Sequence, residues 1–160
     1  EESFVLFSLN RFSYKVKEQL ASNKKIYCID NGFIHAKAFK ISPDMGKLYE
    51  NVVAQKLKKK EIENDFKVYY WKNTQQEEVD FVIKEGTKVK QLIQVCFDIK
   101  NPKTKNREIR ALIKSGKELK CNNLLVITED YESEEKIKWF NDKATIKFIS
   151  LWKWLLGKDE

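Results

Sequence analysis

The stretch that most constrains the fold of this 160-residue chain runs from Glu77 to Asp98, EEVDFVIKEGTKVKQLIQVCFD. Apolar and polar residues alternate along both halves of this stretch. Alternation with period two predicts two β-strands, each with one buried face and one face that carries the polar groups. The apolar residues of the two predicted strands are Val79, Phe81, Ile83, Val89, Ile93, Val95 and Phe97.

The turn between these strands sets which residues face each other. Burying both apolar sets on one side requires odd-numbered residues to pair with odd ones, because a slip of one residue would move one set into water. A three-residue loop, Glu85-Gly86-Thr87, gives that register, and Gly86 can adopt the left-handed conformation that such loops need. Asp80 and Gln94 then lie on one face as diagonal neighbours, with backbones about 7 Å apart, so their side chains can bind one metal ion.

A helix is predicted upstream of this hairpin, from about residue 45 to residue 60, after the start signal Ser42-Pro43-Asp44. Glu50 lies three, four and seven positions before the apolar residues Val53, Ala54 and Leu57, so the four residues lie on one side of the helix. The acid therefore lies beside the buried side of the helix, where a carboxylate without a partner is costly. This position indicates either a functional acid or an acid paired with a lysine at the border of the apolar stripe.

The remaining elements predict an α/β fold. Strands are also predicted at 25–30, 67–73, 123–130 and 144–149, a helix at 104–120 and a short terminal helix at 150–157. The stretch at 123–130, NLLVITED, is a continuous apolar run, which is typical of a central strand buried on both faces. The terminal helix is apolar nearly all round, so we expect it to be buried or to dock on a partner domain. We predict a core domain at 45–160, with residues 1–44 as a connector and strand that pack on it.

The chain carries a formal charge of +7, which favours a polyanionic partner such as nucleic acid. The predicted helix at 104–120 has a basic flank that would lie beside the cleft and contact phosphates. The basic residues in and just before this helix are Lys103, Arg107, Arg110, Lys114 and Lys117. The alternative is an ordinary solvated face, balanced by Glu108 and Glu118.

Several classes of protein are disfavoured. No apolar run approaches the ~20 residues of a membrane span, and no signal peptide is visible. The three cysteines, Cys28, Cys96 and Cys121, lie far apart, and we expect reduced thiols and hence a cytoplasmic protein. The chain contains no GxxxxGK[ST] phosphate loop, so any ATPase activity must lie outside it. The opening Glu1-Glu2-Ser3, without methionine, suggests a piece of a longer protein.

Several of these residues together resemble a known superfamily. An Asp on one strand and an (E/Q)-x-K triplet on the next, behind a helix that carries a Glu, is similar to the restriction-endonuclease-like PD-(D/E)XK superfamily. The matching residues are Glu50, Asp80 and Gln94-Val95-Cys96. The strings KKIYCIDNG at 24–32, GKLYENVV at 46–53, and LIQVC followed by NREIRAL also resemble the C-terminal domain of many archaeal and bacterial AAA-type ATPases. The resemblance covers nearly the whole chain.

The resemblance implies a fold, an activity and a site. The fold would be a mixed central sheet with core order αβββαβ, flanked by helices. The activity would be Mg²⁺-dependent hydrolysis of DNA, with Asp80, Gln94 and Glu50 as catalytic residues and metal ligands, in a chain that also carries an ATPase domain. Cys96 replaces the lysine of the triplet and cannot stabilise charge in the transition state as an ammonium does. The residues considered as its substitutes are Lys84, Lys90, Lys103 and Arg107.

These observations leave three hypotheses. The first is a metal-dependent nuclease that acts on DNA. The second is a degenerate nuclease-like module that binds DNA or protein and serves the neighbouring ATPase, which the loss of the lysine favours. The third is a structural domain that docks through its apolar terminal helix.

Overall fold

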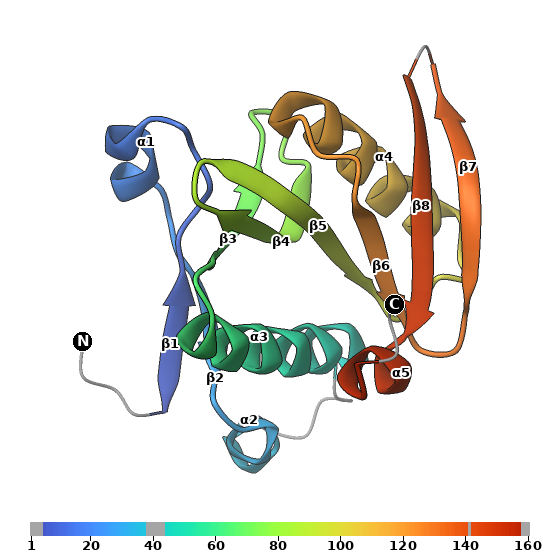
Figure 1. Cartoon of the computed structure of the whole chain (residues 1–160). Helices are drawn as coiled ribbons and strands as arrows, with labels where there is room; N and C mark the ends of the chain where they lie inside the picture. Colours follow the sequence, from blue (N-terminus) through green and yellow to red (C-terminus); the bar gives the residue numbers. More distant parts are fainter. Residues whose placement is uncertain (1–4, 38–43, 141, 158–160) are drawn as a thin grey trace.

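The computed structural model describes residues 5–37, 44–140 and 142–157, which form a mixed α/β fold (Figure 1). A six-stranded sheet has the order β3-β4-β5-β6-β8-β7, and a two-stranded sheet joins β1 and β2. The elements in chain order are β1 (Leu6–Leu9), α1 (Val16–Ala21), β2 (Lys25–Cys28), α2 (Asn31–Lys37), α3 (Met45–Glu63), β3 (Lys67–Lys72), β4 (Glu78–Glu85), β5 (Lys88–Cys96), α4 (Pro102–Leu119), β6 (Leu124–Thr128), β7 (Ser133–Trp139), β8 (Asp142–Ser150) and α5 (Leu151–Leu155).

The large sheet is mixed. Strands β3, β4 and β5 form antiparallel pairs, as do β7 and β8, whereas β6 runs parallel to both β5 and β8. The segment from α3 to β6 therefore has the predicted order of helix, three strands, helix and strand. Every residue of β6 is buried, as expected for a central strand.

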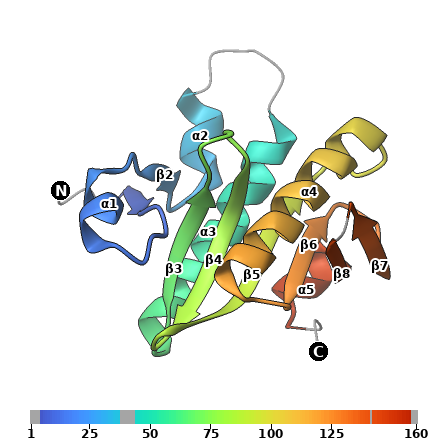
Figure 2. The ribbon, with the colours of Figure 1, turned by 90° about the horizontal axis from the view of Figure 1, so that it is seen from above.

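Helices α3 and α4 cover opposite faces of this sheet (Figure 2). The cluster on the α3 side includes Val53, Ala54, Leu57, Phe81, Ile93 and Leu125. The cluster on the α4 side includes Ile109, Leu112, Ile113, Val82, Leu92 and Val126. Both faces of β4 and β5 are thus buried, and the prediction that one face carries only polar groups is wrong, because Val82 and Leu92 interrupt the alternation.

The β4–β5 hairpin has a shorter turn than predicted. Glu85 pairs with Lys88, so the turn contains two residues rather than three. Gly86 has a φ of 54°, the left-handed conformation that the sequence indicated. A β-bulge follows, because Lys84 pairs with Val89 whereas the preceding Ile83 pairs with Gln91. The extra residue restores the predicted odd-to-odd pairing further along, where Phe81 faces Ile93.

A second irregularity lies in β4 at Asp80. Tyr69 pairs with Val82 and Trp71 with Val79, so three steps along β4 correspond to two along β3. As a result Val79 packs in the α4-side cluster and Phe81 in the α3-side cluster, although the alternation predicted one shared face. Bulges redirect side chains, and they are frequent next to active sites.

The ends of the chain differ from the predictions. The charged stretch at 131–143, to which no strand was assigned, contains the edge strand β7. In α5, Trp154 is buried in the α3-side cluster, whereas Trp152 is exposed, as is Leu156 directly after the helix, so this end of the chain is only partly buried. The three cysteines are buried and form no disulfide. In the described ranges no helix combines the length and the apolar character needed to cross a membrane.

Candidate functional site

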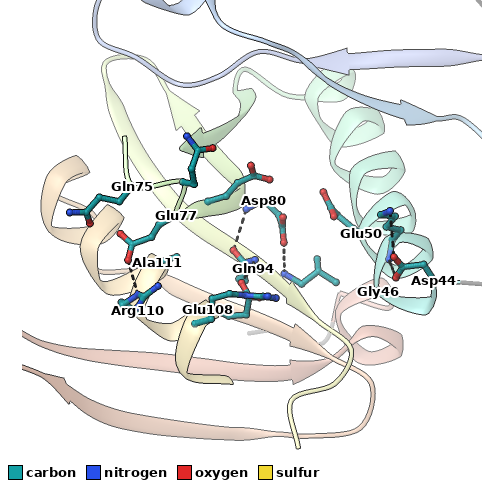
Figure 3. A pocket seen from close by; sticks show the side chains of 15 residues that line it. Asp44, Gly46, Glu50, Gln75, Glu77, Asp80, Gln94, Glu108, Arg110 and Ala111 are labelled. Carbon is teal, nitrogen blue, oxygen red and sulfur yellow. Dashed lines mark hydrogen bonds and ion pairs between the residues drawn. The ribbon is translucent and has the colours of Figure 1, made fainter. Parts of the chain in front are cut away.

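A polar cavity of about 440 Å³ lies between the N-terminal parts of α3 and α4, at the end of the sheet where β4 begins and β5 ends (Figure 3). The three residues predicted as a site, Glu50, Asp80 and Gln94, all line it. Glu50 comes from α3, Asp80 from the irregular part of β4 and Gln94 from β5. The fold therefore brings these three distant residues to one pocket.

Asp80 is almost completely buried, and both of its carboxylate oxygens accept hydrogen bonds from the protein. Oδ2 accepts from the backbone N–H of Val95 at 2.9 Å, and Oδ1 accepts from Nζ of Lys25 at 2.9 Å. Glu50 uses the same lysine, because its Oε1 accepts from Nζ of Lys25 at 2.9 Å and from the hydroxyl of Tyr27 at 2.6 Å. Two carboxylates from different elements thus converge on one cationic centre.

Lys25 is the residue of the site that sequence reasoning missed. It begins β2, in the N-terminal segment placed outside the core domain, and its Nζ also lies 2.6 Å from Oε1 of Glu78. Among the four residues considered as a substitute for the triplet lysine, only Arg107 lines the cavity. A signal was present in the strand KIYCID, because Lys25 and Tyr27 have the period-two spacing of one strand face.

Burial and neighbouring charges shift the titration of this cluster. Burial raises the pKa of Asp80 to about 7, and the negative charge of Glu50 acts in the same direction, against the ammonium of Lys25. Burial alone would lower the pKa of Lys25, but Asp80, Glu50 and Glu78 raise it above its usual range. Lys25 therefore stays protonated at neutral pH, and Asp80 has more negative charge around it than one lysine neutralises.

Gln94 has a different role from the one expected. Its Oε1 accepts from the backbone N–H of Asp80 at 3.3 Å, and its Nε2 donates to Oε2 of Glu108 on α4 at 2.7 Å. Figure 3 shows the Gln94 side chain beside Glu108, whereas the Asp80 carboxylate points toward the N–H of Val95. The amide of Gln94 thus fixes the backbone of Asp80 and does not face the cation position between Asp80 and Glu50.

The carboxylates of this cluster supply some of the oxygen ligands that a hard divalent cation needs. Mg²⁺ binds one or two carboxylates and completes its shell with water and phosphate oxygens. Asp80 and Glu50 supply two such carboxylates around the position that the Lys25 ammonium takes. Within the part of the chain that the structure describes, no group of three or more His, Cys, Asp or Glu is arranged to hold a metal ion.

Cys96 is a buried neutral thiol on the α4 side of the sheet. Burial raises its pKa to about 12, with Glu108 acting in the same direction. A protonated thiol is a poor ligand for magnesium and carries no positive charge. Cys96, at the place of the triplet lysine, therefore contributes to packing and carries no charge.

The predicted basic flank on α4 is largely paired with acids. Arg110 and Lys114 both contact Glu77, at 2.6 and 2.8 Å, and Arg107 contacts Glu108 at 2.5 Å. Lys103, the fourth residue predicted to contact nucleic acid, is exposed in the first turn of α4. These four basic residues face two acids, so the local charge remains positive. Of the two acids expected from the sequence, Glu108 does pair with the flank, whereas Glu118 accepts from the indole of Trp71.

The fold and the pocket define a class of mixed α/β domain, in which two helices enclose a carboxylate pair bridged by a lysine. The family described as "Domain of unknown function (DUF4143)" matches residues 45–154, and the chain belongs to this family. The matched range contains Glu50, Asp80, Gln94 and Glu108, whereas Lys25 lies before it.

One relative of known sequence is an uncharacterized protein, MJ1544, from Methanocaldococcus jannaschii. It is 36% identical over 157 residues, which cover 97% of this chain and 34% of the relative. The chain thus spans about a third of the length of the protein that it resembles.

Proposed function

We propose that this domain is a nuclease-like module of the restriction-endonuclease-like type that contacts nucleic acid and hydrolyses phosphodiester bonds with Mg²⁺. The observation that carries the proposal is the convergence of Asp80 and Glu50 on one cation position, with Lys25 Nζ 2.9 Å from an oxygen of each. The order of elements from α3 to β6 and the irregularity of β4 at Asp80 support it.

In this proposal Asp80 and Glu50 would hold the metal in place of the Lys25 ammonium that lies between them, and the metal would supply polarisation of a phosphoryl oxygen and a bound water of lowered pKa. Lys25 takes over the role left open by Cys96. Its ammonium stays protonated, so it stabilises negative charge on the phosphate and does not act as a base. Gln94 keeps the backbone of Asp80 in position through the hydrogen bond from its N–H.

The wider setting is also a proposal. We infer that the domain belongs to a longer chain, since it covers only 34% of the relative it matches. The resemblance to the C-terminal domain of AAA-type ATPases suggests that this longer chain carries such an ATPase domain, and the reduced cysteines suggest that it is cytoplasmic. DNA is the expected substrate because of the net charge of +7 and the resemblance to nucleases. The exposed Trp152 and Leu156 at the C-terminal end are available to dock on another part of that chain.

A second candidate function is binding without cleavage. Two observations favour it: a protein ammonium already takes the cation position between Asp80 and Glu50, and Cys96 is uncharged. A domain of this kind would bind DNA or protein for a neighbouring ATPase and would have no need of a metal.

Incubation with linear and branched DNA, with and without Mg²⁺ or Mn²⁺, separates the two functions. The informative variant is Asp80→Asn, and Asp65→Asn is a matched control because Asp65 is exposed beyond the end of α3. Metal-dependent cleavage that is lost in Asp80→Asn and kept in Asp65→Asn supports the nuclease. Retarded migration without cleavage, equal in both variants, supports the binding module. Absence of any interaction with DNA at low salt contradicts the nuclease and the DNA-binding module and favours a domain that docks on protein, because contacts to phosphates are strongest there.

A further inference from the structure

A second cavity, of about 550 Å³, shares the lining residue Glu78 with the first. It is formed by the N-terminal segment and the turn between β3 and β4, and four of the residues that line it are basic: Arg11, Lys24, Lys25 and Lys72. We propose that this cavity binds a phosphate group. This cavity adjoins the candidate nuclease site, because Lys25 lines it and also donates to Glu50 and Asp80, but the proposal does not require that the domain cleaves DNA.

The charge balance of the cavity favours an anion. Among the residues that line it, Glu78 is the sole acid against the four basic side chains. Glu78 is itself neutralised, because one carboxylate oxygen lies 2.6 Å from Nζ of Lys25 and the other lies 3.3 Å from Nζ of Lys72. Lys25 is shared further with Asp80 and Glu50. The charge of Arg11 acts on Glu18 and lowers its pKa, but Glu18 has an ion pair of its own with Lys15. Arg11 and Lys24 are therefore the basic groups of the cavity that can attract a ligand of opposite sign.

Arg11 is held in place by its backbone. It forms a parallel β-bridge with Tyr70 of β3, and the neighbouring N–H of Phe12 donates to the carbonyl of Tyr70 at 2.6 Å. The N–H of Tyr70 in turn donates to the carbonyl of Asn10 at 3.1 Å. The guanidinium is thus presented to the cavity from a fixed backbone, which reduces the entropy lost when a ligand binds.

The side chain of Arg11 has unused hydrogen-bonding capacity. Its Nε is buried, and within the described part of the protein it has no hydrogen-bond partner. Buried polar atoms without a partner are rare in folded proteins and call for a ligand or water. A phosphate oxygen is a suitable acceptor, because the planar guanidinium matches phosphate with two parallel hydrogen bonds.

The β3–β4 turn, which also lines the cavity, is fixed as well. Gln76 lines it with a φ of 64°, a left-handed conformation that is unfavourable for a residue other than glycine. The side chain of Asn73 maintains this turn, since its Oδ1 accepts from the N–H groups of Gln75 and Glu77 at 2.9 and 3.0 Å. Gln76 and Glu78 line both cavities, so a phosphate bound here would lie next to the Asp80 pocket.

The phosphate could belong to the end of a nucleic-acid strand or to a free small molecule, and the binding experiment distinguishes these sources. Calorimetry at low ionic strength measures the binding of three ligands. They are inorganic phosphate, a 5′-phosphorylated oligonucleotide and the same oligonucleotide without the 5′-phosphate. The wild-type domain should bind the phosphorylated oligonucleotide about tenfold more tightly than the unphosphorylated one if a strand end is the ligand. Binding of inorganic phosphate as tight as that of the phosphorylated oligonucleotide identifies a small-molecule source.

Arg11→Gln should remove either form of phosphate binding, and Lys24→Gln, at an exposed position, should weaken it without risk to folding. Lys88→Gln is the control, because Lys88 is exposed at the other end of β4 and β5. Circular dichroism verifies that each variant is folded. Failure of the wild type to bind phosphate in any form, or equal loss in Lys24→Gln and Lys88→Gln, overturns the proposal.

Discussion

Nζ of Lys25 donates to Oδ1 of Asp80 at 2.9 Å, although 55 positions separate the two residues in the sequence. The contact joins the small N-terminal sheet to the centre of the large one. The exposed fractions of the two side chains are 19% and 9%, so water screens the pair only weakly. The N-terminal segment therefore completes the candidate site as well as packing beside it.

Replacing Lys25 by Gln should destabilise the fold. The substitution leaves Glu50, Glu78 and Asp80 close together without their shared cation. Breaking a buried ion pair costs about 3–5 kcal/mol, and the remaining exposure of Lys25 reduces this to roughly 2–4 kcal/mol. Urea denaturation at pH 7.5 measures the free energy of unfolding. Lys88→Gln, at an exposed position, should change it by less than about 0.5 kcal/mol, and a similar small loss for Lys25→Gln would refute the central role of this lysine.

Divalent cations should stabilise Lys25→Gln more than they stabilise the wild type. In the wild type a metal must compete with the ammonium for oxygens of Asp80 and Glu50, whereas in the variant both oxygens lack that partner. A ligand that binds only the folded state at a hundred times its Kd adds about 2.7 kcal/mol. The readout is the shift in Tm caused by Mn²⁺ in each protein. Equal shifts in the two proteins would show that the metal does not bind between these carboxylates.

The raised pKa of Asp80 predicts a specific dependence of stability on pH. The pKa of the carboxyl group is about 7 in the folded protein, against an ordinary value of 3.8. Between pH 3.8 and pH 7 the folded state therefore keeps a proton that the unfolded state has lost. This contribution to stability is fully present below pH 4 and is lost as the pH rises through 7. The free energy of unfolding of the wild type, minus that of Asp80→Asn, should therefore fall by roughly a few kcal/mol from pH 4 to pH 8. A difference that stays constant or rises with pH would contradict the assignment.

Gly116 should not tolerate a larger side chain. A Cβ at this position of α4 would lie 2.9 Å from the backbone carbonyl oxygen of Cys121 and 3.2 Å from a methyl group of Leu124. The helix propensity of Ala, about 1 kcal/mol better than that of Gly, is then outweighed by the overlap, and Gly116→Ala should lose roughly 1–3 kcal/mol. Gly46→Ala in the first turn of α3 is the control. Within the described part of the protein its Cβ would contact only Oδ1 of the capping residue Asp44, at 3.3 Å, so urea denaturation should show a smaller loss than for Gly116→Ala.

Local patterns in the sequence predicted most of the elements that form the pocket. The helical spacing after Glu50 and the start signal Ser42-Pro43-Asp44 located α3, and the structure shows Asp44 as its cap, which accepts a hydrogen bond from the N–H of Lys47. The apolar run at 123–130 located the buried strand β6. These signals depend on neighbours within one element, where period and capping chemistry are readable.

The features that sequence reasoning missed depend on contacts between distant elements. The irregularity of β4 at Asp80 arises from pairing with β3 and has no local signature. Strand β7 is an edge strand whose exposed residues are charged, so its alternation resembles a solvated loop. Lys25 reaches Asp80 only because the small sheet packs against α3, which cannot be read from the residues around position 25.

Replacing Gln94 by Ala should test whether this residue positions Asp80. The substitution removes the acceptor for the backbone N–H of Asp80 and a donor to the buried carboxylate of Glu108. Buried groups that lose a partner cost about 1–3 kcal/mol, so the free energy of unfolding should fall by roughly that amount. Gln91→Ala on the same strand is the matched control, because Gln91 makes one exposed hydrogen bond, to Asn123. Gln94→Ala should also lower the pH at which Asp80 loses its proton, since water entering the gap would reduce the effect of burial. The pH profile of stability measures this shift, and an unchanged profile together with a loss no larger than that of Gln91→Ala would show that Gln94 does not position the carboxylate.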